Sequence, residues 1–191
     1  MLATHARGER LKGDELLSEL FDAAGDLERL HDSLDGADFI LDLALRNIPC
    51  EAGIVSFFEM NRREFVVVRQ RGGATKALLL KVPERAEIAN RAMRSRHAVV
   101  LPTLAGELKG DVRWSAMGVE PKSLVCAPIL LGGRYLGLIE LVNPRDEQPF
   151  DAADGNALDY LGQQLAEFLG SRTISVDPET VNKPPLRSRM R

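Results

Sequence analysis

Two apolar, β-branched runs in the last third of the chain are joined by only two residues. The runs are residues 123–131 and 134–142, and Gly132-Gly133 separates them. A two-residue connection allows only a tight turn between antiparallel strands, and glycine supplies the positive φ that such a turn needs. The sequence therefore predicts a β-hairpin here and an antiparallel sheet around it.

Further strands are predicted upstream of this hairpin. Residues 53–59 and 64–70 are β-branched and aromatic, and Asn61-Arg62-Arg63 separates them, which indicates a second hairpin. Short strands are expected at residues 78–82 and 98–101. Between the last of these and the C-terminal hairpin, residues 103–122 form a long irregular segment, with a short helix expected near residues 112–117. A segment of this length within a compact domain is usually functional.

Helical periodicity dominates both ends of the chain. Helices are predicted at residues 14–34, 34–48 and 151–170, and a fourth at residues 84–95, where Pro83 and two acidic residues mark the start. Helices therefore gather at the ends and strands in the middle. This order predicts an α+β fold with a mostly antiparallel sheet.

The first and last helices carry leucines at heptad or near-heptad spacing. Such a seam can join two copies of a chain, and it can equally pack on the protein's own sheet. Because both ends of the chain carry one, we place the homodimer first. The residues predicted at the dimer interface are Leu16, Leu20, Leu27, Leu30, Leu161, Leu165 and Phe168.

Composition excludes several classes of protein. The 191 residues carry a net charge of −3, so binding to nucleic acid is not expected. No apolar run is long enough to cross a membrane, and the N-terminus lacks the apolar block of a signal peptide. The two cysteines, Cys50 and Cys126, form no CxxC pair, which argues against a zinc ribbon or a disulfide framework and fits a cytoplasmic protein.

The charges are segregated along the chain. Residues 14–59 contain twelve acids and two bases, and residues 62–96 contain ten bases and three acids. Such blocks are typical of solvated faces, and they can also steer a partner. We divide the chain into a flexible N-terminus (1–13), a single domain (14–171) and a disordered basic tail or linker (172–191).

The second half of the chain resembles the C-terminal half of a GAF domain. The resemblance rests on residues 123–129 (SLVCAPI), Gly132-Gly133, residues 135–143 (YLGLIELVN), Phe150-Asp151 and the long amphipathic helix that follows. The hairpin at residues 53–70 and the two leading helices match the front half of that domain, so the resemblance covers about residues 14–171. It implies a profilin-like sheet of six antiparallel strands, with the N- and C-terminal helices on one face and a ligand pocket on the other. Members of this family act as sensory or dimerisation modules.

The sequence lacks most of the residues that the specialised members of that family use for their activities. In cyclic-nucleotide-binding members a Lys follows the Asn and pairs with an Asp; here Pro144 follows Asn143, although Phe150 and Asp154 match. Residues 103–122 contain neither Cys nor His for bilin attachment, and no histidine stands out as a haem ligand. Cys50 and Cys126 are far apart in sequence, unlike a paired redox site. No nucleotide-binding or hydrolase motif occurs, so we predict no enzyme, no cofactor and no metal.

The irregular segment contains the best pocket candidate, Trp114. Its aromatic plate, with Arg113 and Ser115 beside it, suits a flat anionic ligand, although Trp114 can equally cap the core. Further candidates come from strands expected to line the same face: Phe57, Arg69, Leu101 and Cys126.

These patterns predict a non-catalytic sensory or regulatory module, homodimeric, that binds a small ligand and signals to a partner protein. The alternative is a scaffold of the same fold that binds no ligand and works through protein contacts; cyclic-nucleotide binding ranks below both. The pocket distinguishes them. A filled interior with Trp114 packed inward favours the scaffold, and an open cavity with convergent polar groups favours the sensor.

Overall fold

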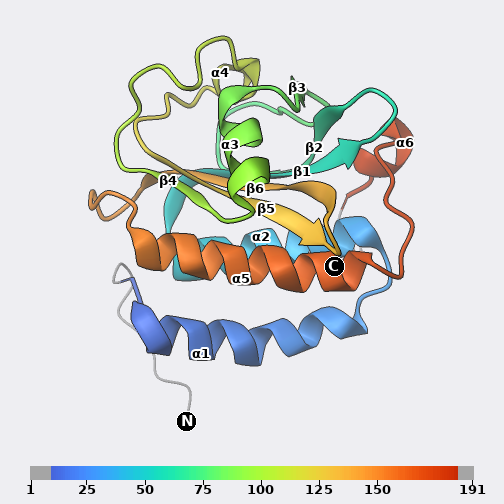
Figure 1. The fold of residues 1–191 in the computed structure, drawn as a ribbon, viewed down its shortest axis with the longest axis horizontal. Helices are drawn as coiled ribbons and strands as arrows, with labels where there is room; N and C mark the ends of the chain where they lie inside the picture. The colour runs from blue at the N-terminus through green and yellow to red at the C-terminus, as the bar shows by residue number, and fades with distance from the viewer. Residues whose placement is uncertain (1–9, 185–191) are drawn as a thin grey trace.

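The computed structural model describes residues 10–184, and its elements follow the predicted order (Figure 1). The helices are α1 (Gly13–Ala24), the 3-10 helix η1 (Gly25–Arg29), α2 (Ser33–Asn47), α3 (Glu87–Ser95), α4 (Val112–Ala116), α5 (Ala152–Leu169) and α6 (Pro178–Val181). The strands are β1 (Cys50–Glu59), β2 (Glu64–Arg71), β3 (Lys81–Pro83), β4 (Val99–Leu101), β5 (Leu124–Leu131) and β6 (Arg134–Pro144).

The strands form one six-stranded antiparallel sheet in the order β3-β2-β1-β6-β5-β4. Both predicted hairpins are confirmed. The β5–β6 hairpin turns at Gly132 and Gly133, whose φ values of +55° and +83° are those of a tight hairpin turn. The two central strands, β1 and β6, are far apart in the sequence. They pair with one another and so join the two hairpins into one sheet.

Each face of the sheet carries its own core. On one face, α2 and α5 cover the strands and α1 lies outside them (Figure 1); the buried residues here form the helix-side core. On the other face lie α3, α4 and the irregular segment, and their buried residues form the loop-side core. The predicted α+β architecture, with the terminal helices on one face, is confirmed.

The predicted helix over residues 14–34 is shorter in the structure. It continues as α-helix only to Ala24, tightens into η1 at Gly25 and ends at Arg29. Glycine is a weak helix former, and the α-helix gives way to the 3-10 helix at Gly25. The next helix begins at Ser33, where the Asp32 side chain accepts the N–H of Leu34 at 2.6 Å.

The residues predicted for the dimer interface lie in the protein's own core. Six of them are buried within the protomer as part of the helix-side core, and Leu30 is partly buried against it. A heptad seam and the inner stripe of an amphipathic helix have nearly the same spacing, and here the seam packs against the neighbouring helices. These side chains are therefore not available to a second copy, and dimerisation itself stays a prediction. The seven are Leu16, Leu20, Leu27, Leu30, Leu161, Leu165 and Phe168.

Two mid-chain elements are displaced from their predicted bounds. The short strand covers Lys81–Pro83 in place of residues 78–82, and α3 begins at Glu87 in place of residue 84. Pro83 ends the edge strand β3 and does not open the helix. A proline is accommodated at a strand edge because it has no N–H to contribute to the ladder.

The chain ends are more ordered than predicted. Within the stretch predicted to be flexible, Arg10 is buried and donates to Asp154 at 2.6 Å and to Asp146 at 2.5 Å. Within the stretch predicted to be disordered, α6 folds back onto the domain, and Val181 is 1% exposed in the helix-side core. In the structure these contacts place Arg10 and Val181 with the domain, outside its predicted bounds of residues 14–171. Residues 1–9 and 185–191 lie outside the described part of the chain.

Candidate functional site

The irregular segment closes over the loop-side core and carries α4 near its end. Asp111 caps α4, because its carboxylate accepts the N–H of Arg113 at 3.0 Å. The loop after β2 holds the other end of the helix, where Ala74 donates its N–H to the Met117 carbonyl at 2.8 Å. With both ends fastened, Trp114 packs inward and is only 1% exposed.

A buried ion pair lies between α4 and the sheet. Arg113 donates to both carboxylate oxygens of Glu140 on β6, at 2.6 and 3.0 Å. The same guanidinium donates to Asp111 at 2.7 and 3.0 Å. Arg113 and Glu140 are 2% and 0% exposed. The guanidinium is thus clamped between two carboxylates and ties the irregular segment to the central strand.

Burial controls the electrostatics of this cluster. It raises the pKa of Glu140, and the Arg113 guanidinium opposes that rise. Across the β5–β6 ladder from Glu140 lies Cys126, whose thiol pKa is raised first by burial and then by the Glu140 charge. A thiol in this setting stays protonated and is a poor nucleophile.

The structure brings four of the predicted pocket residues to one face. Trp114, Leu101 and Cys126 belong to the loop-side core, and Arg113 reaches the same face through Glu140. The three core members are at most 8% exposed. They are packed as part of the loop-side core, and a ligand site at these residues stays a prediction.

The other three predicted pocket residues lie elsewhere. Phe57 is buried in the helix-side core, on the opposite face of the sheet. Arg69 also faces the helices, where it donates to Asp38 on α2 at 2.5 Å and to the Val181 carbonyl at 3.0 Å. Ser115 is exposed and bonds only within α4. The structure therefore does not bring these three residues together with Trp114 in the loop-side core.

Two members of the buried cluster were missed from the sequence. Glu140 is the single charged residue between Leu136 and Val142, a run otherwise suited to a strand buried on both faces. A carboxylate at such a position needs a buried partner, and that requirement was the available signal. Asp111, immediately before the short helix, carried the usual mark of a helix cap.

The cation expected after Asn143 is supplied from another part of the chain. Pro144 cannot pair with Asp154, and Arg10 does so from the N-terminal segment. Asp154 also closes a capping box with Asp151 at the start of α5. Arg10 is therefore the cation that pairs with Asp154 in this structure.

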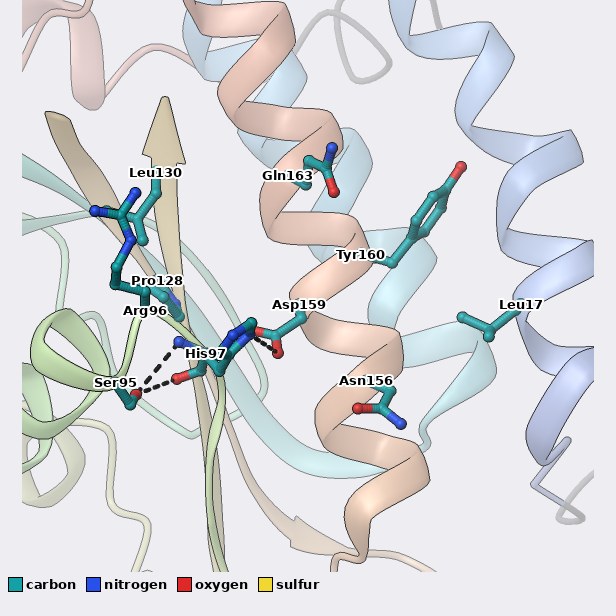
Figure 2. A pocket seen from close by; sticks show the side chains of 10 residues that line it. All are labelled: Leu17, Ser95, Arg96, His97, Pro128, Leu130, Asn156, Asp159, Tyr160 and Gln163. Carbon is teal, nitrogen blue, oxygen red and sulfur yellow. Dashed lines mark hydrogen bonds and ion pairs between the residues drawn. The ribbon is translucent and has the colours of Figure 1, made fainter. Parts of the chain in front are cut away.

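Four hollows in the surface of residues 10–184, with volumes of about 290, 390, 420 and 640 Å³, are lined by neither Trp114 nor Arg113. The largest lies between α1, α5 and the turn after α3 (Figure 2). Its walls include Leu17, Tyr160 and His97, and His97 Nδ1 is 3.5 Å from Asp159.

The two cysteines do not meet. Cys50 lies in the helix-side core and Cys126 in the loop-side core, so the sheet stands between them. Burial raises the pKa of the Cys50 thiol, which donates to the Ile48 carbonyl at 2.9 Å. Within residues 10–184, no group of three or more potential metal ligands gathers, and no helix is both long and apolar enough to span a bilayer.

Comparison with known families supports the resemblance inferred from the sequence. The family model described as GAF domain matches residues 32–169, which is well over half of the chain. A comparison with curated proteins found no match.

Several solved structures share the fold. The GAF domain of a phosphoenolpyruvate-protein phosphotransferase from Coxiella burnetii is 16% identical, with 81% of this chain and 92% of that chain covered and a TM-score of 0.69. A free methionine-R-sulfoxide reductase from Neisseria meningitidis is 14% identical over 87% and 96%, with a TM-score of 0.62. The chromophore-binding domain of a Stigmatella aurantiaca bacteriophytochrome is 14% identical over 83% and 61%, with a TM-score of 0.64. At these identities the likeness shows the fold alone.

Proposed function

The chain belongs to the GAF domain family, and from this premise we propose that it is a non-catalytic regulatory module that works through contacts with another protein. The observation that carries the proposal is the loop-side face of the sheet. This is the face on which the family resemblance predicts a pocket, and here Trp114 packs into it at 1% exposure beside the clamped Arg113–Glu140 pair.

The filled face favours a scaffold over a sensor. A ligand in this region would have to displace Trp114 from the core or break two charge-assisted hydrogen bonds to Glu140. Burying a large aromatic side chain contributes about 1.5–3 kcal/mol, which ligand binding would have to offset before gaining affinity. Protein contacts at the outer surface carry no such cost.

The state of the cysteines supports a role without redox chemistry. Both thiols are buried with raised pKa values, and they lie on opposite faces of the sheet. A pair that exchanges disulfides needs a thiolate fraction and direct access between the two sulfurs. The likeness to a methionine sulfoxide reductase therefore extends to the fold and finds no support in the sulfur chemistry.

One observation favours ligand sensing as a second candidate. Two buried polar atoms on the loop-side face, Ser56 Oγ and Trp114 Nε1, have no hydrogen-bond partner among the described residues. Ser56 pairs in the ladder with Val67 and Leu138, both of which belong to the loop-side core, so it faces the same side as Trp114. Unpartnered buried polar groups are costly, and a small polar ligand would satisfy them.

Native mass spectrometry of protein purified from cells distinguishes the two candidates. The scaffold predicts the mass of the polypeptide alone, with no small molecule released on denaturation. A bound molecule that is lost from the Trp114→Ala variant, but retained by the Met60→Ala variant at an exposed distant site, would replace the scaffold by the sensor. Trp114 is the single tryptophan, so its fluorescence reports independently whether that side chain moves.

A further inference from the structure

The outer side of α1 exposes two large apolar side chains one turn apart. Phe21 is 69% exposed and Leu17 is 37% exposed, and they are two of the four large apolar residues exposed within residues 10–184. Residues at i and i+4 share a ridge of a helix. The inner side of the same helix is already occupied, because Leu16 and Leu20 pack in the helix-side core.

A groove adjoins this ridge. The hollow of about 640 Å³ begins at Leu17 and continues along α5, past Asn156, Tyr160 and Gln163. Figure 2 shows the side chains of Leu17 on α1 and Tyr160 on α5 projecting into the space between the two helices. An apolar ridge beside a groove is the form in which proteins receive an amphipathic helix, with anchors spaced three or four residues apart.

The same surface is strongly acidic. Gly13–Arg29 contains six acids and one base, a net of −5. The base, Arg29, is 3.1 Å from Asp26. The other five acids are exposed and have no hydrogen bond or ion pair within the described part of the chain: Asp14, Glu15, Glu19, Asp22 and Glu28.

These charges decide what kind of partner fits. Two copies of the chain meeting through this surface would bring a net of −5 against −5, and like charges at close range repel. A cationic segment would gain attraction from the same five carboxylates. Arg96 stands on the far rim of the groove, so the positive edge of the partner must lie against α1 and its apolar anchors against Leu17 and Phe21.

We propose that the α1 surface formed by Leu17, Phe21 and the five unpartnered carboxylates docks a cationic amphipathic helix of a partner protein. Phe21 and Leu17 receive its apolar anchors, and the carboxylates receive its lysine or arginine side chains. This rests on the proposed function and names the surface and the partner's chemistry.

A displayed library of random peptides, about 16 residues long so that each can form a helix of about 24 Å, tests the proposal directly. The full chain serves as bait, and the Phe21→Ser variant serves for counter-selection. We expect the enriched peptides to carry net positive charge and two apolar residues three or four positions apart. Enrichment of neutral or acidic peptides, or enrichment that the Phe21→Ser bait reproduces, overturns the proposal.

Fluorescence anisotropy of the best peptide then separates the two contributions. Phe21→Ser is expected to weaken binding about tenfold, the effect of losing one apolar anchor. The triple variant Glu15→Gln/Glu19→Gln/Asp22→Asn is expected to weaken it at about 0.05 M salt and to lose most of the salt dependence. Met60→Ser and Glu179→Gln, exposed at other sites, are the matched controls and should bind as the wild type does.

Two other occupants, a second copy of the chain at Phe21 and a small molecule at Trp114, would have different consequences. A dimer in sedimentation that Phe21→Ser dissociates would mean that a second copy occupies the surface, and the proposal fails. A small molecule found at Trp114 with peptide binding intact would remove the scaffold function and leave the docking surface standing. The two proposals can therefore fail separately.

Discussion

Removing Arg113 should leave a carboxylate buried without its counter-ion. In Arg113→Met the apolar stem is kept and the guanidinium is lost, so Glu140, at 0% exposure, loses two hydrogen bonds of 2.6 and 3.0 Å. No other hydrogen-bond partner of its side chain is present in residues 10–184. Breaking one side of a buried ion pair costs about 3–5 kcal/mol, and we expect a loss of that size in the free energy of unfolding.

The double variant Arg113→Met/Glu140→Leu supplies the control. Replacing both partners by apolar side chains is often close to neutral, so the double variant should recover most of the stability that the single variant loses. Asp111 loses its ion pair in both variants but still caps α4 through the backbone N–H of residue 113. A double variant that is as unstable as the single one would show that the guanidinium matters for packing and not for the charge of Glu140.

The loss should also depend on pH. Without Arg113, burial and then the Asp111 charge act on Glu140, and both hold its folded-state pKa above the unfolded value. The native state then binds more protons than the unfolded state between those two values, so stability falls as pH rises. Denaturant unfolding followed by Trp114 fluorescence should show a larger loss at about pH 7 than at about pH 5. A loss below about 1 kcal/mol, or one that is larger at the lower pH, refutes the reasoning.

Three further substitutions test other parts of the fold by denaturant unfolding. Arg10→Met should cost about 3 kcal/mol, because it removes the cation that pairs with the buried Asp154 and the partly buried Asp146. Because Arg10 lowers the pKa of Asp146, the stability it confers is lost as pH falls through the normal aspartate range, and the variant should show a shallower decline below about pH 4. Gly137→Ala should cost about 1–3 kcal/mol, since its Cβ would stand 2.2 Å from the Ser56 carbonyl oxygen, and unchanged stability would contradict that contact. Gly25→Ala, with φ of −57° and open space around it, should gain about 0.5–1 kcal/mol, and a loss would show that the 3-10 turn needs glycine.

Features with local causes could be predicted from the sequence. The Gly132-Gly133 turn fixes its hairpin through two adjacent positive φ values. Asp151 begins α5 as expected, because its side chain accepts the N–H groups of Ala153 and Asp154. The turn and the helix cap each depend on residues within a few positions of one another, so both can be predicted from the local sequence.

The sequences of β1 and β2 could not predict toward which face of the sheet each side chain points. Regular alternation places Arg69 with Phe65 and Val67 on the loop side. The ladder, however, pairs Val55 with Arg69 and the next residue, Ser56, with Val67, so β2 holds one extra residue and Arg69 turns to the helices. The amino-acid sequence of an apolar strand does not indicate where such a bulge lies.

The connection between the N-terminal segment and α5 is equally hidden, and it matters for the docking proposal. Arg10 lies three residues before α1 and makes charged hydrogen bonds to Asp146, before α5, and to Asp154, in its first turn. Lys12 adds a contact of 2.9 Å to Asp151, the residue that caps α5. A partner that draws α1 outward must therefore break these contacts or pull on the segment between β6 and α5. The acidic surface of α1 is thus fastened to the start of α5 by ion pairs between residues that lie more than 130 positions apart in the sequence, and no local pattern in the sequence could have indicated them.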